Sequence, residues 1–192
     1  MNNDMTDKID DIGESNDNSQ NENKFMKFFT EWILPIFLAL IIAGLINKFL
    51  IFKVYIPSES MLPTLKVGDQ LFVTKIYNTE KIEREDIIVF YSNELEDLLI
   101  KRVIGLPGDT VEIKDDGKVF VNGEELKEEY VKHQDDRGGK FKVPENKFFF
   151  LGDNRANSKD SRWWKDPFID KSDIKGKAQV RVYPFDRVGM VR

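Results

Sequence analysis

The longest apolar segment of the chain, residues 28–52, predicts a membrane-spanning helix. Its uninterrupted part, residues 32–46, is short for a bilayer that needs about 20 residues. Lysine side chains near the ends can reach the interface, and Trp32 suits the interfacial region. A cleaved signal peptide is the alternative, but no small-x-small cleavage site follows the segment, which favours an uncleaved anchor. Lys24 and Lys27 precede its apolar part, residues 32–46, and Lys48 and Lys53 follow that part, so charge leaves the orientation open.

From Val54 the pattern changes to short apolar runs separated by turns, which predicts a β-rich domain of the sandwich or barrel type. Asp116-Gly117 is a strong hairpin signal between two of these runs. Residues 124–146 are polar and predict an excursion from the main sheet. The predicted strands and hairpin are residues 70–77, 86–91, 98–105, 110–122, 148–151, 178–184 and 188–191.

The first 23 residues contain almost no apolar side chains and carry seven acids against one base, Lys8. Such a segment cannot bury enough surface to offset its ordering entropy, so a disordered acidic tail is predicted, ending at residue 27 before the apolar segment. The whole chain of 192 residues has a net charge of −5, which leaves the remainder near neutral, at +1. No basic surface or nucleic-acid motif stands out, which argues against a nucleic-acid partner.

Composition narrows the possible chemistry. The chain has no cysteine, which excludes disulfides, thiolate zinc sites and a cysteine nucleophile. It has a single histidine, His133, so a multi-histidine metal site is excluded. His133 lies in a charged, loop-like stretch, which makes a histidine base unfavourable.

Directly after the apolar segment, two prolines bracket two serines within residues 56–65. Proline fixes φ and removes a backbone donor, so this stretch predicts a rigid, irregular turn that holds Ser60 in one place. Serines between prolines often form only a turn, and that alternative stands on these residues alone.

Lys101 and Arg102 interrupt the apolar run of residues 98–105. One explanation is an edge strand with solvated or paired charges. The other is a buried Lys101, because desolvation disfavours the ammonium and lowers the lysine pKa. A neutral lysine amine can deprotonate a serine hydroxyl, and serine–lysine pairs are a known variant of the serine nucleophile.

A third stretch, residues 152–162, follows an apolar strand and is dense in hydrogen-bonding groups. A polar surface loop or a cation loop is the alternative, but the stretch does not match the EF-hand pattern. Its functional use would be to orient the base and to brace the serine turn through Asp–Arg pairs.

Residues 57–65, 101–109 and 152–162 together resemble the three signature boxes of bacterial type I signal peptidases, in the right order after an anchor. The resemblance covers residues 54–192. It implies a role for each of eight side chains: Ser60 as nucleophile, Lys101 as general base, Ser58 in the oxyanion hole, Ser158 orienting Lys101, Asp160 bracing the site with Arg102 and Arg162, and Asp153 in support of the site.

The resemblance also implies a fold and a setting. The fold is a largely antiparallel β-sheet or partial barrel, with residues 113–146 as a small inserted cap. The substrates are secretory preproteins with small residues in an A-x-A pattern, and no cofactor or metal is needed. The tail lies in the cytoplasm and the domain on the outer face, in contact with lipid and close to the secretion translocon.

Two residues depart from the family pattern: Glu59 stands where many members have glycine, and Ala156 where many have aspartate. Two competing functions remain. A self-cleaving repressor with a serine–lysine pair would carry a DNA-binding domain, and none is visible. An inactive, membrane-tethered β-domain that binds preproteins would not require both Ser60 and Lys101.

Overall fold

The computed structural model describes residues 26–191, and these divide into a helical segment up to Lys48 and a compact domain from Phe49 onward. The predicted acidic tail, residues 1–27, lies outside the described residues except for Met26 and Lys27.

The first unit is a continuous helix from Met26 to Phe49, long and apolar enough by length and composition to cross a membrane. Its residues Phe29–Ile33 form a π-helical turn (η1), and Leu34–Phe49 form α2. The π-turn stands just before Pro35, whose ring lacks an N–H and would meet the carbonyl four residues earlier in a regular α-helix. A wider turn at this point accommodates the proline.

The helix ends three residues earlier than the sequence predicts. Ile51 and Phe52 belong to strand β1 (Ile51–Tyr55), where they pair with Thr74 and Val73. Residues 51–55 are apolar at most positions and β-branched or aromatic, a composition that favours a strand. The apolar run therefore joined the end of a helix to the start of a strand.

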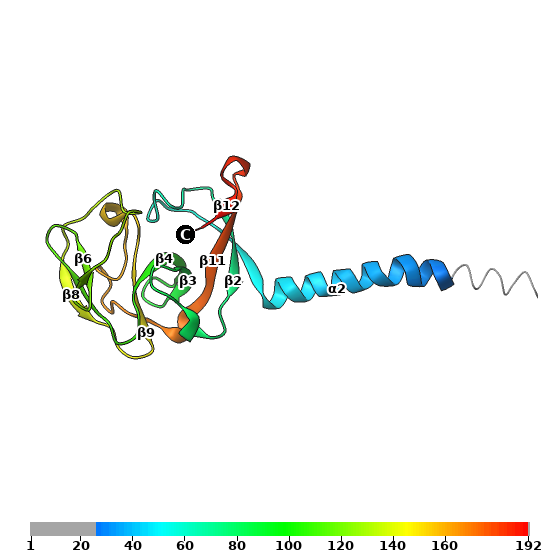
Figure 1. Ribbon diagram of the computed structural model, residues 1–192, viewed down its shortest axis with the longest axis horizontal. Coiled ribbons are helices and arrows are strands. Elements are labelled where there is room, and N and C mark those ends of the chain that lie inside the picture. Colours follow the sequence, from blue (N-terminus) through cyan, green and yellow to red (C-terminus); the bar gives the residue numbers. More distant parts are fainter. Residues whose placement is uncertain (1–25, 192) are drawn as a thin grey trace, which may run out of the picture. The chain divides into compact units, whose positions relative to one another are not determined.

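Two antiparallel sheets make up the second unit (Figure 1). The main sheet has the order β1-β2-β11-β3-β4-β9-β10, with β12 paired to β11, and the smaller sheet has the order β7-β6-β5-β8. The main-sheet strands after β1 are β2 (Gln70–Lys75), β3 (Ile87–Ser92), β4 (Asp97–Gly105), β9 (Lys147–Leu151), β10 (Ile169–Asp170), β11 (Ile174–Tyr183) and β12 (Gly189–Met190). Those of the smaller sheet are β5 (Thr110–Ile113), β6 (Val119–Val121), β7 (Glu124–Glu125) and β8 (Gly139–Lys142).

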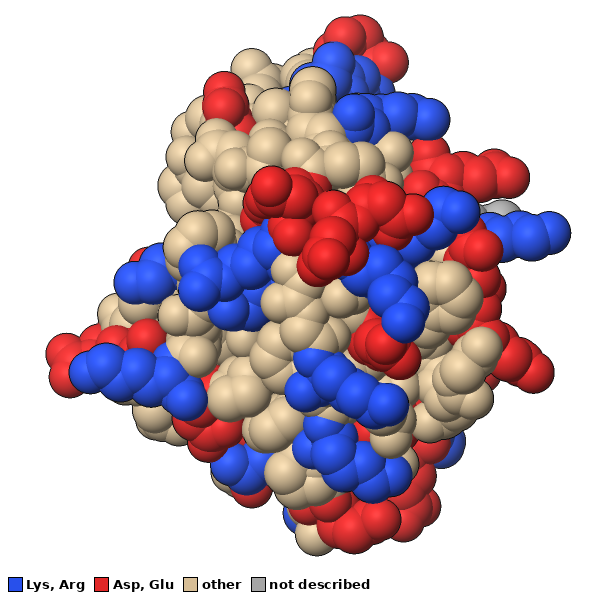
Figure 2. Space-filling view, turned by 90° about the vertical axis from the view of Figure 1, so that its left-hand side faces the viewer, with Lys and Arg blue, Asp and Glu red and all other residues tan. Residues whose placement is uncertain are grey.

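This architecture confirms the predicted antiparallel β fold, and the smaller sheet arises largely from the segment expected to form the cap. Between the strands are short 3-10 turns: η2 (Thr79–Lys81), η3 (Arg155–Asn157), η4 (Lys171–Asp173) and η5 (Phe185–Arg187). The face seen from the side of β6 and β8 carries acidic and basic side chains close together, with an acidic group near its centre (Figure 2).

Strand β11 begins four residues before the predicted start, at Ile174. Lysines and Gly176 interrupt the apolar pattern at the start of β11, so the sequence did not predict a strand there. The close packing of the sheet requires a glycine at position 176. A Cβ at position 176 would lie 2.4 Å from the Thr74 carbonyl oxygen of the neighbouring strand. Gly176 therefore allows β11 to lie between β2 and β3 at the centre of the sheet.

Three apolar clusters stabilise the domain. One lies beneath the serine turn and includes Ile56, Met61 and Leu65, each at most 1% exposed. A second joins the smaller sheet to Phe149 and Leu151 of β9. The third, around Phe90 and Phe150, fills the other side of β3, β4 and β9.

Candidate active site

The serine turn is a closed loop held at both ends. The Ile56 N–H donates to the Asp69 carbonyl and the Gly68 N–H donates to the Ile56 carbonyl, each at 2.9 Å. Met61 and Leu65 pack into the core below, whereas Ser58 and Glu59 of the turn are exposed. Ser60 is 8% exposed within this turn.

Long-range ion pairs fix the same turn to the C-terminal strands. Arg181 of β11 donates to the Thr64 carbonyl and to the Asp69 carboxylate, both at 3.0 Å. Arg187 donates to the second oxygen of Asp69 at 2.8 Å, and Asp69 is 1% exposed. Two guanidinium groups around one buried carboxylate thus tie the turn to β11 and η5 through charge-assisted hydrogen bonds.

Strand β4 places Lys101 in the interior. It lies between β3 and β9, with Lys101 opposite Ile88 and Arg102 opposite both Ile87 and Leu151. Both basic residues are buried, and the edge-strand explanation for them is therefore wrong. The Lys101 Nζ makes a short hydrogen bond to the Ser60 Oγ, so the structure brings the predicted base and nucleophile into direct contact.

Burial sets the protonation of this amine. Desolvation lowers the pKa of Lys101 to about 8, while the negative charges of Asp160 and Asp153 oppose that shift. A large fraction of the amine is consequently neutral in mildly alkaline solution, as a general base requires. Lys101 itself is 4% exposed, so solvent does little to screen these effects.

Ser58 lies beside the pair on its exposed side. Its Oγ is 3.3 Å from the Ser60 Oγ, and either hydroxyl can be the donor. A hydroxyl at this place is near the oxygen that would attack a carbonyl, although the role in an oxyanion hole stays a prediction.

Asp153 connects β4 to the serine turn. The Arg102 guanidinium donates to both of its oxygens, at 2.8 and 2.7 Å, and the Thr64 hydroxyl donates to one of them at 2.5 Å. The resemblance implied that Asp160 would brace the site with Arg102 and Arg162. Asp160 pairs with Arg162 at 2.9 Å and accepts from the Gly152 N–H at 3.0 Å, but it makes no contact with Arg102 among the described hydrogen bonds. The bracing carboxylate of Arg102 is Asp153.

Ser158 is close to the serine turn through Gly152. A Cβ on Gly152 would lie 2.2 Å from the Ser158 Oγ and 2.5 Å from the Ser60 carbonyl oxygen, so only glycine allows this approach. The Ser158 Oγ is buried and has no hydrogen-bond partner within residues 26–191. The predicted bond that orients Lys101 is therefore absent from this geometry, and the orienting role stays a prediction.

Several contacts of the site were not predicted. The Asn154 N–H donates to the Ser60 carbonyl at 3.1 Å, and its side-chain amide donates to the Glu59 carbonyl at 3.2 Å. Asn154 lies in the third motif, but its partners depend on the long-range approach of two loops. His133 contributes through its main chain, because its carbonyl accepts from the Ala156 N–H at 3.1 Å. Its exposed imidazole has no assigned role.

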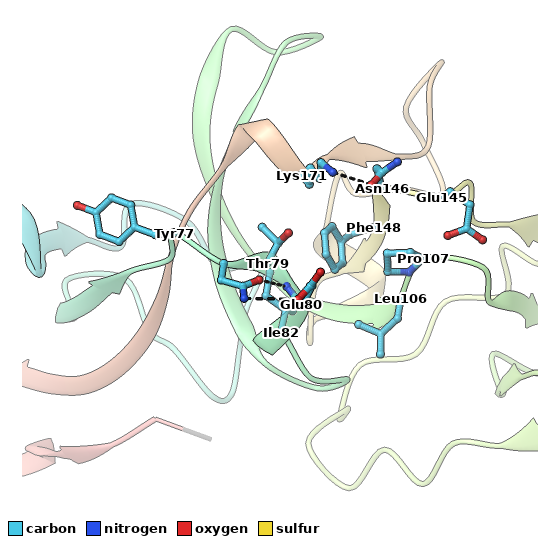
Figure 3. Close-up of a pocket in the computed structure, with 11 residues that line it drawn as sticks. Tyr77, Thr79, Glu80, Ile82, Leu106, Pro107, Glu145, Asn146, Phe148 and Lys171 are labelled. Carbon is cyan, nitrogen blue, oxygen red and sulfur yellow. Dashed lines mark hydrogen bonds between the residues drawn. The ribbon is translucent and has the colours of Figure 1, made fainter.

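Other features of the described chain do not compete with this site. No group of three or more His, Asp or Glu side chains within residues 26–191 is placed to hold a metal ion. A cavity of about 550 Å³ lies between η2, Leu106-Pro107 and Phe148, with Lys171 and Asn146 hydrogen-bonded at its rim (Figure 3). Its lining includes none of Ser58, Ser60 and Lys101, so we do not assign the reaction to this cavity despite its size.

Known proteins of similar sequence point to one family. A family model described as signal peptidase, peptidase S26, matches residues 29–183. A signal peptidase I of Leptolyngbya laminosa is 44% identical over 169 residues, covering 83% of this chain and 82% of the relative. Signal peptidase I P of Bacillus subtilis subsp. natto is 41% identical over 170 residues, covering 82% and 91%. A crystal structure of a signal peptidase I from Enterococcus faecalis, 36% identical, matches with a TM-score of 0.43 over 50% of this chain and 96% of that chain.

Proposed function

We propose that this chain, which belongs to the signal peptidase family (peptidase S26) and is a serine endopeptidase of the signal peptidase I type, cleaves preproteins through Ser60 and Lys101. The observation that carries the proposal is the buried hydrogen bond between the Lys101 amine and the Ser60 hydroxyl. Because the pKa of Lys101 is lowered to about 8, that amine can accept a proton near neutral pH.

The reaction is a serine acyl transfer. Neutral Lys101 takes the hydroxyl proton as the Ser60 Oγ bonds to the scissile carbonyl carbon. The tetrahedral intermediate collapses to an ester on Ser60, and Lys101 gives its proton to the leaving amine. The leaving amine is the new N-terminus of the mature protein, and the ester holds the signal peptide. Neutral Lys101 then takes a proton from water, whose oxygen attacks the ester, and returns a proton to Ser60 as the signal peptide leaves with a C-terminal carboxyl group.

Stabilisation of the oxyanion falls to the Ser58 hydroxyl and the Ser60 backbone N–H. Loss of one such donor typically costs about 10²–10³ in rate. The 3.3 Å separation between the Ser58 Oγ and the Ser60 Oγ supports this role, and the exposure of Ser58 leaves it accessible to a substrate. Two ion pairs support the Ser60–Lys101 pair by holding the loop of residues 152–162 in place: Arg102 with Asp153, and Arg162 with Asp160.

The substrates are secretory preproteins with small residues before the cleavage site, in the A-x-A pattern. The apolar helix Met26–Phe49 anchors the enzyme in the cell membrane, with the N-terminus in the cytoplasm and the peptidase domain on the outer face. This placement brings the domain to the lipid surface and near the secretion translocon, where signal segments end. No cofactor takes part.

The test is cleavage of a purified preprotein by the detergent-solubilised full chain. Ser60→Ala and Lys101→Ala should each abolish cleavage while circular dichroism shows a retained fold. Ser172→Ala and Lys165→Ala, exposed positions outside the site, are matched controls that should cleave normally. Full activity of folded Lys101→Ala would exclude the proposed base, and lack of cleavage by the unaltered chain would exclude the reaction.

A further inference from the structure

Residues 128–137, which we name the strap, run without regular secondary structure between β7 and β8. Three of their side chains each contact a different buried arginine of the site. Glu128 forms a two-oxygen pair with Arg155, with one bond at 2.9 Å. The other two contacts are the Tyr130 ring, 3.9 Å below the Arg102 guanidinium, and the Asp135 carboxylate, which accepts from Arg162 at 2.7 Å.

Each of these arginines also has a partner on the side of the reaction site. Arg102 holds Asp153, and Arg162 holds Asp160. Arg155 donates to the Gly152 carbonyl at 3.0 Å, and within residues 26–191 its carboxylate partner is Glu128. All three arginine side chains are 2% exposed. Each guanidinium is therefore a bridge from the strap to the segment that surrounds Lys101.

The main chain adds a direct connection. His133 and Asn154 form a parallel bridge, and the Ala156 N–H donates to the His133 carbonyl. The Asn154 N–H in turn donates to the Ser60 carbonyl. The Tyr130 hydroxyl donates to Glu128 at 3.1 Å, which ties the strap to itself. Two hydrogen-bonded steps thus separate the strap from the main chain of Ser60.

We propose that the strap is a positioning element for the reaction at Ser60 and Lys101, in which Glu128, Tyr130 and Asp135 fix the three arginines and thereby the loop of residues 152–162. The inference rests on the proposed function. A buried guanidinium without its counter-charge must move or recruit water. Such movement would shift Asp153, Asp160 and Gly152 relative to Lys101, and small misplacements of reacting groups cost rate more than substrate binding.

The experiment measures kcat and KM of full-length strap variants on a preprotein. Glu128→Gln and Asp135→Asn should lower kcat about tenfold to hundredfold with little change in KM, the range expected when a reacting group moves by about 1 Å. Their matched controls are Glu129→Gln and Asp136→Asn, adjacent exposed carboxylates that have no side-chain partner in the described part of the chain. The controls should match the unaltered chain.

A second pair of variants changes Tyr130 and leaves the carboxylate partners of all three buried arginines in place. Tyr130→Leu removes the aromatic face under Arg102 and should lower kcat. Tyr130→Phe keeps that face and should have a kcat close to that of the unaltered chain. This pair decides the question if Glu128→Gln fails to fold. Folded strap variants with the kcat of their controls would overturn the proposal, and so would equal effects of Tyr130→Leu and Tyr130→Phe.

A readout independent of cleavage separates this inference from the proposed function. Hydrogen exchange at the Ala156 amide, which donates to the strap, should be faster in Glu128→Gln than in Glu129→Gln. Unchanged exchange would overturn the strap's hold on the loop. If Ser60→Ala cleaved as well as the unaltered chain, the proposed chemistry would fail while this exchange result still tested the strap.

Discussion

The Lys101 amine lies inside β4 with the hydroxyl of Ser60 against it, and burial is the largest influence on its pKa. In the proposed mechanism the neutral amine is the reactive form, so we expect kcat/KM to rise with pH, with a midpoint near the lowered pKa of about 8. Below that midpoint the rate should fall about tenfold per pH unit. Measurement of kcat/KM from pH 6 to 10 checks this expectation, and a flat profile across neutral pH would contradict a lysine base.

The same group links stability to pH. The unfolded chain carries Lys101 with its ordinary pKa of 10.5, so between about pH 8 and 10.5 it binds more protons than the folded chain. The contribution of Lys101 to the free energy of unfolding therefore rises with pH across that window and reaches its full value above 10.5. Urea denaturation of Lys101→Met at several pH values should lack this rise, which makes it the control.

At the residue scale, the sequence predicted some contacts of the site and missed others. The contact between Ser60 and Lys101 could be expected, because few residue types supply a candidate nucleophile and a candidate base in a chain with one histidine. The partners of Arg102 could not, because Asp153 and Asp160 both lie in one motif and only the folded loop decides which one reaches β4. The sequence did not indicate that Glu128 and Asp135 contact buried arginines, since charged residues in a polar segment predict solvent exposure.

At the scale of elements, the serine turn depends on the end of β11. Arg181 and Arg187 enclose the Asp69 carboxylate, so removal of its charge leaves two partly buried guanidiniums facing each other. We expect Asp69→Asn to lower the free energy of unfolding by about 3 kcal/mol, a typical effect of breaking a buried pair. Urea denaturation measures the change. Asp186→Asn, an exposed neighbour of Arg187, is the control and should change stability little.

Elements with a clear local pattern were predicted, and those defined by long-range pairing were not. The runs that became β3 and β9 are almost continuously apolar, as central strands are, and the run that became β4 is apolar on both sides of Lys101 and Arg102. Strands β7 and β10 have two residues each and exist only through their neighbours β6 and β9. The early start of β11 and the strand β1 were missed because lysines, a glycine and an adjoining helix obscured their patterns.

At the scale of the molecule, an apolar helix precedes a domain with its own sheets and core, and Phe49–Arg192 is a compact unit by itself. All groups proposed for the reaction lie in that unit. We therefore expect a chain that begins at Phe49 to cleave a short soluble peptide with unchanged kcat/KM. Cleavage of a preprotein inserted in lipid vesicles should fall about 10²–10⁴-fold, because the anchor supplies effective concentration and no reactive group.

Two variants separate the anchor from the segment before it. Deletion of residues 2–23 alone, which retains the helix, should leave vesicle cleavage intact. Replacement of residues 26–48 by an unrelated apolar helix of equal length should restore it, since confinement to the bilayer depends on length and hydrophobicity rather than on sequence. Equal cleavage of both substrates by the chain that begins at Phe49 would show that the helix does not concentrate the enzyme at its substrate. Failure of the replacement helix would instead assign the Met26–Phe49 sequence a specific contact with the substrate or the secretion machinery.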